Sequence, residues 1–414
     1  MASTPSSEPE RRNNLTSTIK IATRLLLISA LALVALCLLT VPTHPVHASS
    51  GGSLQLGSIA VQSSITCPGG QWLHGMTCFP AVLTGCQNVD QISFTFGQLI
   101  PTGTVKGVVV YFDGGDGITA AAEATELSML QYYVTQSYAV VEIAWSSPWE
   151  QTTNANIQNA ACRPATFLSY VYNGIYQSIS TGTGGNSGAG MCAQGFSAGS
   201  TAIAYALAYY GAGLNLDAVE LISGPVTSDI NQGCEQSPPA VTVCGSGQYG
   251  CQLGVDTPWT LPPTYVANDV NYINSWTNSN TCTTGSNPKW LAQSIVDQNA
   301  GATPTFSYPN TAMSAWLCST VQNPQGINCA TGYQPDFCPN NSSSQGEIFY
   351  NEFTSINHPP VYNVYSVDNC FGPEGVPQGS VSALSKLNNN PPIIAPGDQS
   401  IRQDMTAHCA HPTR

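Results

Sequence analysis

Residues 195–199 read Gly-Phe-Ser-Ala-Gly, and this pentapeptide together with its two flanks decides the fold. A strand-like stretch over residues 188–195 leads into it, and a helix of small residues is expected over residues 200–210. A G-x-S-x-G pentapeptide between a strand and a helix is typical of a sharp turn that holds the serine hydroxyl clear of the sheet. A chain with 38 glycines also forms Gly/Ser turns that carry no chemistry. The strand–helix setting favours Ser197 as a nucleophile.

Strands and helices alternate on both sides of this turn. Residues 105–112 and 138–145 are continuous apolar, β-branched runs, as in strands that are buried on both faces of a parallel sheet. Further strands are expected over residues 92–96, 216–222 and 361–367, and helices over residues 119–133, 166–178, 345–356, 380–387 and 400–407. The alternation predicts a doubly wound, mostly parallel α/β sheet.

The alternation stops after Gly224. Residues 225–345 contain seven cysteines, many prolines and glycines, and four of the seven tryptophans. We expect a largely irregular, disulfide-rich insertion or cap that divides the core into residues 67–224 and 346–414, with residues 49–66 as a flexible leader. The aromatic residues of the insertion either line a substrate site or fill a small core of its own.

The N-terminus has the layout of an export signal. Arg24 precedes an apolar run over residues 25–41, and Val46-His47-Ala48 then fits a signal-peptide cleavage site. We predict a signal peptide over residues 1–48 and a secreted protein with no stable membrane partner. Because seventeen apolar residues approach the length of a membrane span, an uncleaved anchor is the alternative.

The composition excludes several classes of protein. Only 8% of the residues are charged and 42% are hydrophobic, which excludes a charge-rich disordered chain and a coiled coil. A net charge of −13 argues against a nucleic-acid partner. Of the fifteen cysteines, Cys37 lies in the apolar run, and the other fourteen predict up to seven disulfides in an oxidising compartment. Nothing in the sequence predicts the oligomeric state.

The pentapeptide, with the Gly-Gly pair after the first buried strand, resembles the α/β-hydrolase superfamily, and in particular its secreted serine esterases and lipases. Asp113-Gly114-Gly115 occupies the place where these enzymes carry an H-G-G loop, although Asp113 replaces the histidine. The resemblance implies an oxyanion hole formed by the backbone N–H of Ala198 and that of Gly114 or Gly115. A plain strand-to-helix turn is the alternative for the Gly-Gly pair.

The resemblance also implies a histidine base. The family order of serine, acid and histidine excludes His74. His358 precedes the expected strand over residues 361–367, so it would lie at the end away from the serine. His408 is therefore the expected base, and His411 is the alternative.

The step His408-Cys409 resembles that of tannase and feruloyl-esterase-like members of the fold, whose cysteine is disulfide-linked. In those enzymes the second cysteine directly precedes the serine, where this chain has Phe196. The spacing of His408, Cys409 and His411 also resembles a metal-ligand pair, but no other ligand cluster accompanies it. We therefore expect neither a metal nor a cofactor.

Asp368 is the expected acid because it directly ends the strand over residues 361–367. Glu374 and Asp229 are the other candidates, whereas Asp404 is expected on a helix surface. Cys370 lies two residues after the proposed acid, and Cys409 lies one residue after the proposed base. If the two loops meet at one edge of the sheet, their cysteines fall within disulfide range, so we predict a Cys370–Cys409 bond. The alternative is that each cysteine pairs elsewhere.

Export, Ser197 and the Gly-Gly loop together predict a secreted serine carboxylester hydrolase. Its expected substrate is an extracellular ester, small or polymeric: a plant-wall ester, a lipid or a polyester. A serine peptidase on the same fold and a non-catalytic binding protein on a hydrolase scaffold are the alternatives.

Overall fold

The computed structural model describes most of residues 54–225 and several short segments beyond them. The gaps in the first part are residues 70, 115–116, 122–123, 154–156, 182–185, 212–215 and 223; the later segments are residues 294–295, 308, 310–318, 320–322, 327–328, 349, 362–367, 370–371, 381–386 and 397–409. The expected signal peptide and most of the expected insertion lie outside the described residues. No helix among the described residues is long and apolar enough to cross a membrane.

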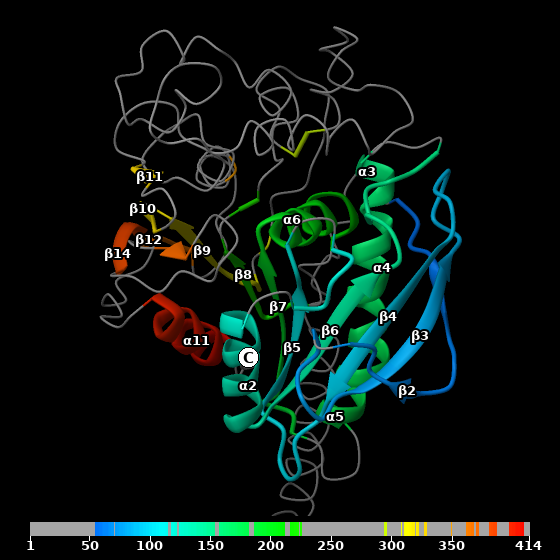
Figure 1. The fold of residues 1–414 in the computed structure, drawn as a ribbon, viewed down its shortest axis with the longest axis horizontal. Coiled ribbons are helices and arrows are strands. Elements are labelled where there is room, and N and C mark those ends of the chain that lie inside the picture. The colour runs from blue at the N-terminus through cyan, green and yellow to red at the C-terminus, as the bar shows by residue number, and fades with distance from the viewer. Residues whose placement is uncertain are drawn as a thin grey trace, which may run out of the picture. The chain divides into compact units, whose positions relative to one another are not determined.

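Eleven strands in the described part of the chain form one sheet, in the order β1-β3-β4-β6-β5-β7-β8-β9-β12-β14 with β2 paired to β3 (Figure 1). The strands from β6 to β12 in this order are parallel, while β3, β4 and β14 run antiparallel to their neighbours. The bounds are β1 Ser58–Val61, β2 Ile65–Thr66, β3 Thr77–Thr84, β4 Ile92–Leu99, β5 Gly107–Phe112, β6 Tyr138–Trp145, β7 Gly190–Phe196, β8 Ala218–Ile222, β9 Ala312–Cys318, β12 Tyr362–Val367 and β14 Val381–Lys386. A separate three-stranded sheet joins β10 (Thr320–Gln322), β11 (Ile327–Asn328) and β13 (Cys370–Phe371).

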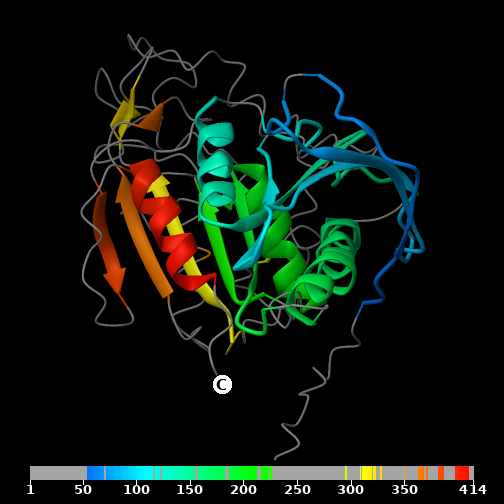
Figure 2. The ribbon, with the colours of Figure 1, turned by 90° about the horizontal axis from the view of Figure 1, so that it is seen from below.

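The centre of the large sheet is buried on both faces. All six residues of β5 and all seven of β7 are buried. Helices α2 (Ala124–Thr135) and α11 (Gly397–His408) cover one face, and α4 (Cys162–Tyr170) and α6 (Ala198–Tyr210) cover the other (Figure 2). This arrangement confirms the predicted doubly wound, mostly parallel α/β sheet.

The remaining helical segments are short. Helix α3 (Ile157–Ala160) precedes α4, and a π-helical turn (Val171–Tyr176) joins α4 to α5 (Gln177–Thr181). The sequence predicts one continuous helix over residues 166–178, which is correct in type but misses the change of pitch. The expected helix over residues 345–356 lies outside the described residues apart from Phe349.

Two predictions on the C-terminal half are wrong. Strand β9 lies inside the segment expected to be an irregular insertion, yet it pairs with both β8 and β12 in the central sheet. The insertion therefore does not run unbroken over residues 225–345. Residues 381–386 form the edge strand β14 where a helix was expected, because pairing with β12 provides hydrogen bonds that a short local pattern does not predict.

Candidate active site

Ser197 stands at the turn between β7 and α6 in a strained backbone conformation. Its φ of 50° and ψ of −119° lie in a region that non-glycine residues rarely adopt. The Ser197 N–H donates to the carbonyl of Ile222 at 2.8 Å, which ties the turn to β8. Ser197 is half-buried, whereas every other residue from Gly190 to Ala208 is buried. The turn thus presents the hydroxyl at the carboxyl end of β7, as predicted.

Glycines let the strand, the helix and the next strand come close together at this turn. A Cβ on Gly195 would lie 2.5 Å from the backbone of Gly199, and one on Gly199 would lie 2.2 Å from the carbonyl oxygen of Phe112. Real Cβ atoms essentially never come within 3.0 Å of such atoms. Both glycines of the pentapeptide are therefore needed for packing.

The mostly parallel sheet with helices on both faces, and the serine turn between β7 and α6, make the fold α/β-hydrolase-like. No protein-family model matches the sequence, and a search of curated sequences finds no match. Among solved structures, the fold is similar to an esterase from Rhizomucor miehei, with 11% sequence identity, 86% of this chain and 84% of the other covered, and a TM-score of 0.41.

Two bacterial structures have a similar sequence identity, coverage and TM-score. A putative carboxylesterase from Lactobacillus plantarum has 12% identity, with 81% of this chain and 98% of the other covered and a TM-score of 0.36. Acetyl xylan esterase 1 from Thermoanaerobacterium has 10% identity, with 75% and 83% covered and a TM-score of 0.35. At these identities the likenesses concern the fold alone and assign no activity to this chain.

The loop after β5 lies directly against the serine. A Cβ on Gly114 would lie 3.1 Å from the Ser197 Cβ, so this position favours glycine as well. The Gly114 N–H, however, donates to Oδ1 of Asp113 at 2.7 Å. The predicted loop is therefore in place, but the Gly114 N–H is not free to bind an oxyanion. Gly115 lies outside the described residues.

Ala198 is the other residue predicted to donate to an oxyanion. It is the first residue of α6, directly after Ser197. The first N–H groups of a helix have no acceptor within the helix, and they form the positive end of its dipole. The Ala198 N–H is thus the described donor best placed for an anion that forms on the serine.

The expected base, His408, lies at the wrong edge of the sheet. It ends α11 beside Cys409, which forms a disulfide with Cys192 near the start of β7. Five residues of parallel strand separate Cys192 from Ser197, which is about 16 Å at 3.3 Å per residue. The hydroxyl of Tyr138, the first residue of β6, donates to the carbonyl of Thr406 at 2.9 Å, which places the end of α11 at the amino edge of the sheet. The prediction of His408 as base is wrong, because α11 runs away from Ser197.

His408 has a structural partner instead. Its Nδ1 lies 3.4 Å from Oδ1 of Asp404, whose other oxygen accepts a hydrogen bond from the hydroxyl of Ser314 on β9. Asp404 is 2% exposed, so the expectation that it lies on a helix surface is also wrong. Burial lowers the pKa of the His408 imidazole, but the hydrogen bond and charge of Asp404 outweigh it and leave the pKa raised.

The Cys192–Cys409 bond replaces the predicted Cys370–Cys409 bond. The Cα atoms of Cys192 and Cys409 are 5.7 Å apart, within the ordinary range for a disulfide. Two further described disulfides join Cys67 to Cys78 and Cys86 to Cys162. Since the partner of Cys409 is not the residue before the serine, the likeness to tannase and feruloyl esterases is not supported in this detail.

The other predicted site residues lie outside the described part of the chain. They are Asp368, Glu374 and Asp229 as acids and His411 as the alternative base. The strand that precedes Asp368, β12, is parallel to β7 through β8 and β9 and so ends at the edge of the sheet that carries Ser197. His74, the other described histidine, is exposed in the segment before β3, several strands away from β7.

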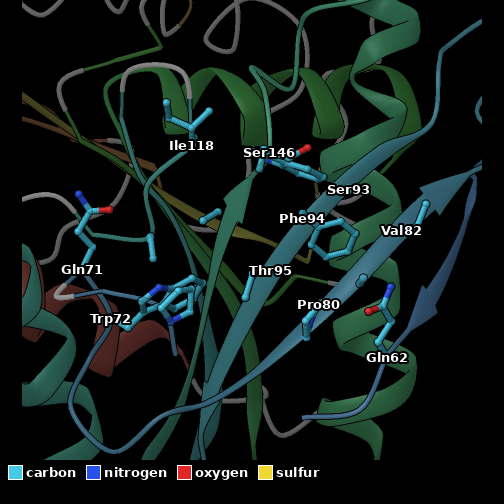
Figure 3. A pocket seen from close by; sticks show the side chains of 15 residues that line it. Gln62, Gln71, Trp72, Pro80, Val82, Ser93, Phe94, Thr95, Ile118 and Ser146 are labelled. Carbon is cyan, nitrogen blue, oxygen red and sulfur yellow. The ribbon is translucent and has the colours of Figure 1, made fainter. Parts of the chain in front are cut away.

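A pocket of about 340 Å³ includes Ile118, from the loop that follows β5, in its lining (Figure 3). Residues of β3 and β4, the end of β6, Trp72 and Ile118 line it, and none of its lining residues is charged. Strands β6 and β5 separate β4 from β7, so this pocket does not contain Ser197. It therefore does not define the ester site.

Sequence reasoning missed two buried acids near the loop. Asp113 is 4% exposed and bonds within the loop itself, and its departure from the family's histidine was the available signal. Glu142 on β6 is fully buried and accepts the N–H of Leu73 at 3.3 Å. Burial, supported by the charge of Asp113 and opposed by the Leu73 bond, raises the pKa of Glu142 to about 8.

Proposed function

We propose that this chain is an exported serine carboxylester hydrolase with Ser197 as its nucleophile. The observation that carries the proposal is the strained backbone of Ser197 at an accessible turn between a buried strand and the N-terminus of α6. Strain of this kind persists only where the surrounding packing enforces it, and it concentrates at functional sites. Here the close backbone contacts of Gly195 and Gly199 are the packing that holds Ser197 in its strained conformation.

The chemistry follows from this geometry. The Ser197 hydroxyl attacks the ester carbonyl, a histidine takes the hydroxyl proton and later gives it to the leaving alcohol, and water hydrolyses the acyl-enzyme. The Ala198 N–H stabilises the oxyanion of the tetrahedral intermediate. His411 lies two residues after Cys409 in the sequence, so the disulfide that excludes His408 also argues against His411, and we leave the base unassigned. Of the predicted acids we propose Asp368, which follows β12 in the sequence, because β12 ends at the edge of the sheet that carries Ser197.

Because the protein is proposed to be exported, its proposed substrate is an extracellular ester, either a small ester or a polymeric one. The three described disulfides support export, because such bonds form and persist in oxidising compartments. The apolar run over residues 25–41 is the proposed export signal.

Hydrolysis of p-nitrophenyl acetate by the wild type and by Ser197→Ala tests the proposal. We expect the variant to lose at least about 10³-fold in kcat, because the acyl-enzyme can no longer form. Ser180→Ala is the matched control, since Ser180 is a half-buried serine on α5 and its loss should leave kcat unchanged. Equal rates for wild type and Ser197→Ala would refute the proposal.

A fluorophosphonate probe separates the alternatives. Labelling of Ser197 with no ester turnover but with peptide cleavage would favour a peptidase, and absence of labelling would favour a non-catalytic binding protein. For the base, His408→Ala should leave turnover unchanged, because the end of α11 lies at the opposite edge of the sheet. Loss of turnover in His408→Ala would return His408 to the catalytic site, and loss of turnover in His411→Ala alone would assign the base to His411.

A further inference from the structure

The carboxylate of Asp113 holds both ends of the loop that lies against Ser197. Its Oδ1 accepts the Gly114 N–H at 2.7 Å, and its Oδ2 accepts a hydrogen bond from the hydroxyl of Thr119. Two bonds from one buried side chain thus join the first and the last part of a loop of seven residues.

A turn inside the loop completes this arrangement. The Gly117 N–H donates to the carbonyl of Gly114 at 3.1 Å, and the Trp145 N–H donates to the carbonyl of Gly117 at 2.9 Å. The second bond fixes the loop to the end of β6. Gly117 has a φ of +66°, which favours glycine at this turn.

The position of the loop matters because it forms one wall beside the serine. Gly114 lies close to Ser197, with only 3.1 Å between the position of a Cβ on Gly114 and the Ser197 Cβ. A shift of about 1 Å in such a wall is enough to change a reaction rate by about 10²-fold. Whatever holds Gly114 in place therefore controls the geometry at the nucleophile.

We propose that Asp113 is a positioning residue for the reaction at Ser197: its carboxylate joins Gly114 to Thr119, engages the Gly114 N–H and so holds Gly114 against the serine. The oxyanion is accordingly bound without that N–H, and the Ala198 N–H is a donor that remains. This inference rests on the proposed function. It gives Asp113 a role that differs from supplying a proton or a charge to the substrate.

Three variants test the inference through kcat and KM for p-nitrophenyl acetate. Asp113→Ala removes both hydrogen bonds. We expect kcat to fall about 10–100-fold and KM to change less than about threefold, because Gly114 is then misplaced beside the nucleophile. Asp113→Asn keeps an oxygen that accepts the Gly114 N–H and an N–H that donates to the Thr119 hydroxyl, so kcat should stay within about threefold of the wild type. Thr119→Val removes one bond only and should lie between the two.

Asp217→Ala is the matched control. Asp217 also accepts a backbone N–H through its carboxylate, that of Met191 at 2.8 Å, but at the amino edge of the sheet. Its loss should lower stability and leave kcat unchanged. If Asp113→Ala does not fold, Thr119→Val against Asp217→Ala decides the question.

The outcomes are distinguishable. Fluorophosphonate labelling of the wild type together with a wild-type kcat in Asp113→Ala would overturn the inference and leave the proposed function standing. An equal loss in Asp217→Ala, or a loss in Asp113→Asn as large as in Asp113→Ala, would also overturn it. A wild type that neither is labelled nor hydrolyses the ester would overturn the proposed function and with it the role of Asp113.

Discussion

At the scale of single residues, the turn around Ser197 depends on two glycines, Gly195 and Gly199, because there is no room for a Cβ atom at either position. Gly199 lies against the carbonyl of Phe112 on β5, and Gly195 lies against the backbone of Gly199. The hydroxyl is therefore presented by the contact of three backbone segments, and any added methyl group in this contact must displace one of them.

We predict that Gly199→Ala destabilises the protein and lowers esterase activity. Its Cβ would lie 2.2 Å from a backbone carbonyl oxygen that belongs to a buried strand and has no room to move, so a cost of about 1–3 kcal/mol is expected. Gly174→Ala is the control, because no atom lies within 4 Å of the position of its Cβ. It should leave stability unchanged or raise it by up to about 1 kcal/mol. Urea unfolding of both variants checks this, and equal stabilities would contradict it.

The features around Ser197 were predictable because they depend on residues that are adjacent in sequence. A buried strand, a pentapeptide and a helix of small residues leave a continuous signature over residues 188–210. The occupation of the Gly114 N–H was not predictable, since it depends on the rotamer of Asp113 and on Thr119 six residues away. The sequence of a glycine-rich loop thus predicts where a backbone N–H donor lies, but it does not predict whether another group in the protein already accepts that hydrogen bond.

At the scale of elements, the direction of α11 decides which histidine can act. Helix α11 was predictable from sequence, but the edge of the sheet at which it ends was not. That edge is fixed by contacts between residues far apart in sequence, the Cys192–Cys409 bond and the hydrogen bond from Tyr138 to Thr406. Strand β14 was missed because its six residues are too few to separate a period of 2 from one of 3.6. Strand β9 was missed for a related reason, since its apolar run lies in a segment otherwise rich in cysteine, proline and glycine.

His408→Ala should therefore affect stability and not catalysis. Because Asp404 raises the folded-state pKa of His408 above its ordinary value of 6.5, the pair stabilises the fold fully below that value, and the stabilisation is lost as the pH rises through the raised pKa. We expect the variant to lose about 1–2 kcal/mol at pH 5.5 and less at pH 9, with kcat unchanged. His74→Ala, at an exposed position, is the control and should change neither quantity.

Chemical unfolding of His408→Ala and His74→Ala at the two pH values measures this difference. A loss that grows towards alkaline pH would contradict the assignment of the pair, since the sign of the linkage would then be reversed. A loss of kcat without loss of stability would return His408 to the catalytic site.

At the scale of the whole molecule, few charges are available to stabilise the fold. The chain has ten Lys and Arg against 23 Asp and Glu, so ion pairs are limited and the acidic residues repel one another. The described disulfides connect distant parts of the core instead. Their sequence separations are 11, 76 and 217 residues, and the longest joins the last described helix to the central strand β7.

We predict that the cost of removing each disulfide follows the length of the chain it closes. The loop-entropy relation gives about 3 kcal/mol for Cys67–Cys78, about 4.5 for Cys86–Cys162 and about 5 for Cys192–Cys409. Paired Cys→Ala variants, one for each bond, avoid free thiols, and urea unfolding gives the three costs. The Cys192–Cys409 variant should be the least stable, yet Ser197 should still react with a fluorophosphonate wherever that variant stays folded, because the bond lies at the opposite edge of the sheet. If the Cys67–Cys78 variant is the least stable of the three, local packing around the bonds, and not loop closure, sets their contributions.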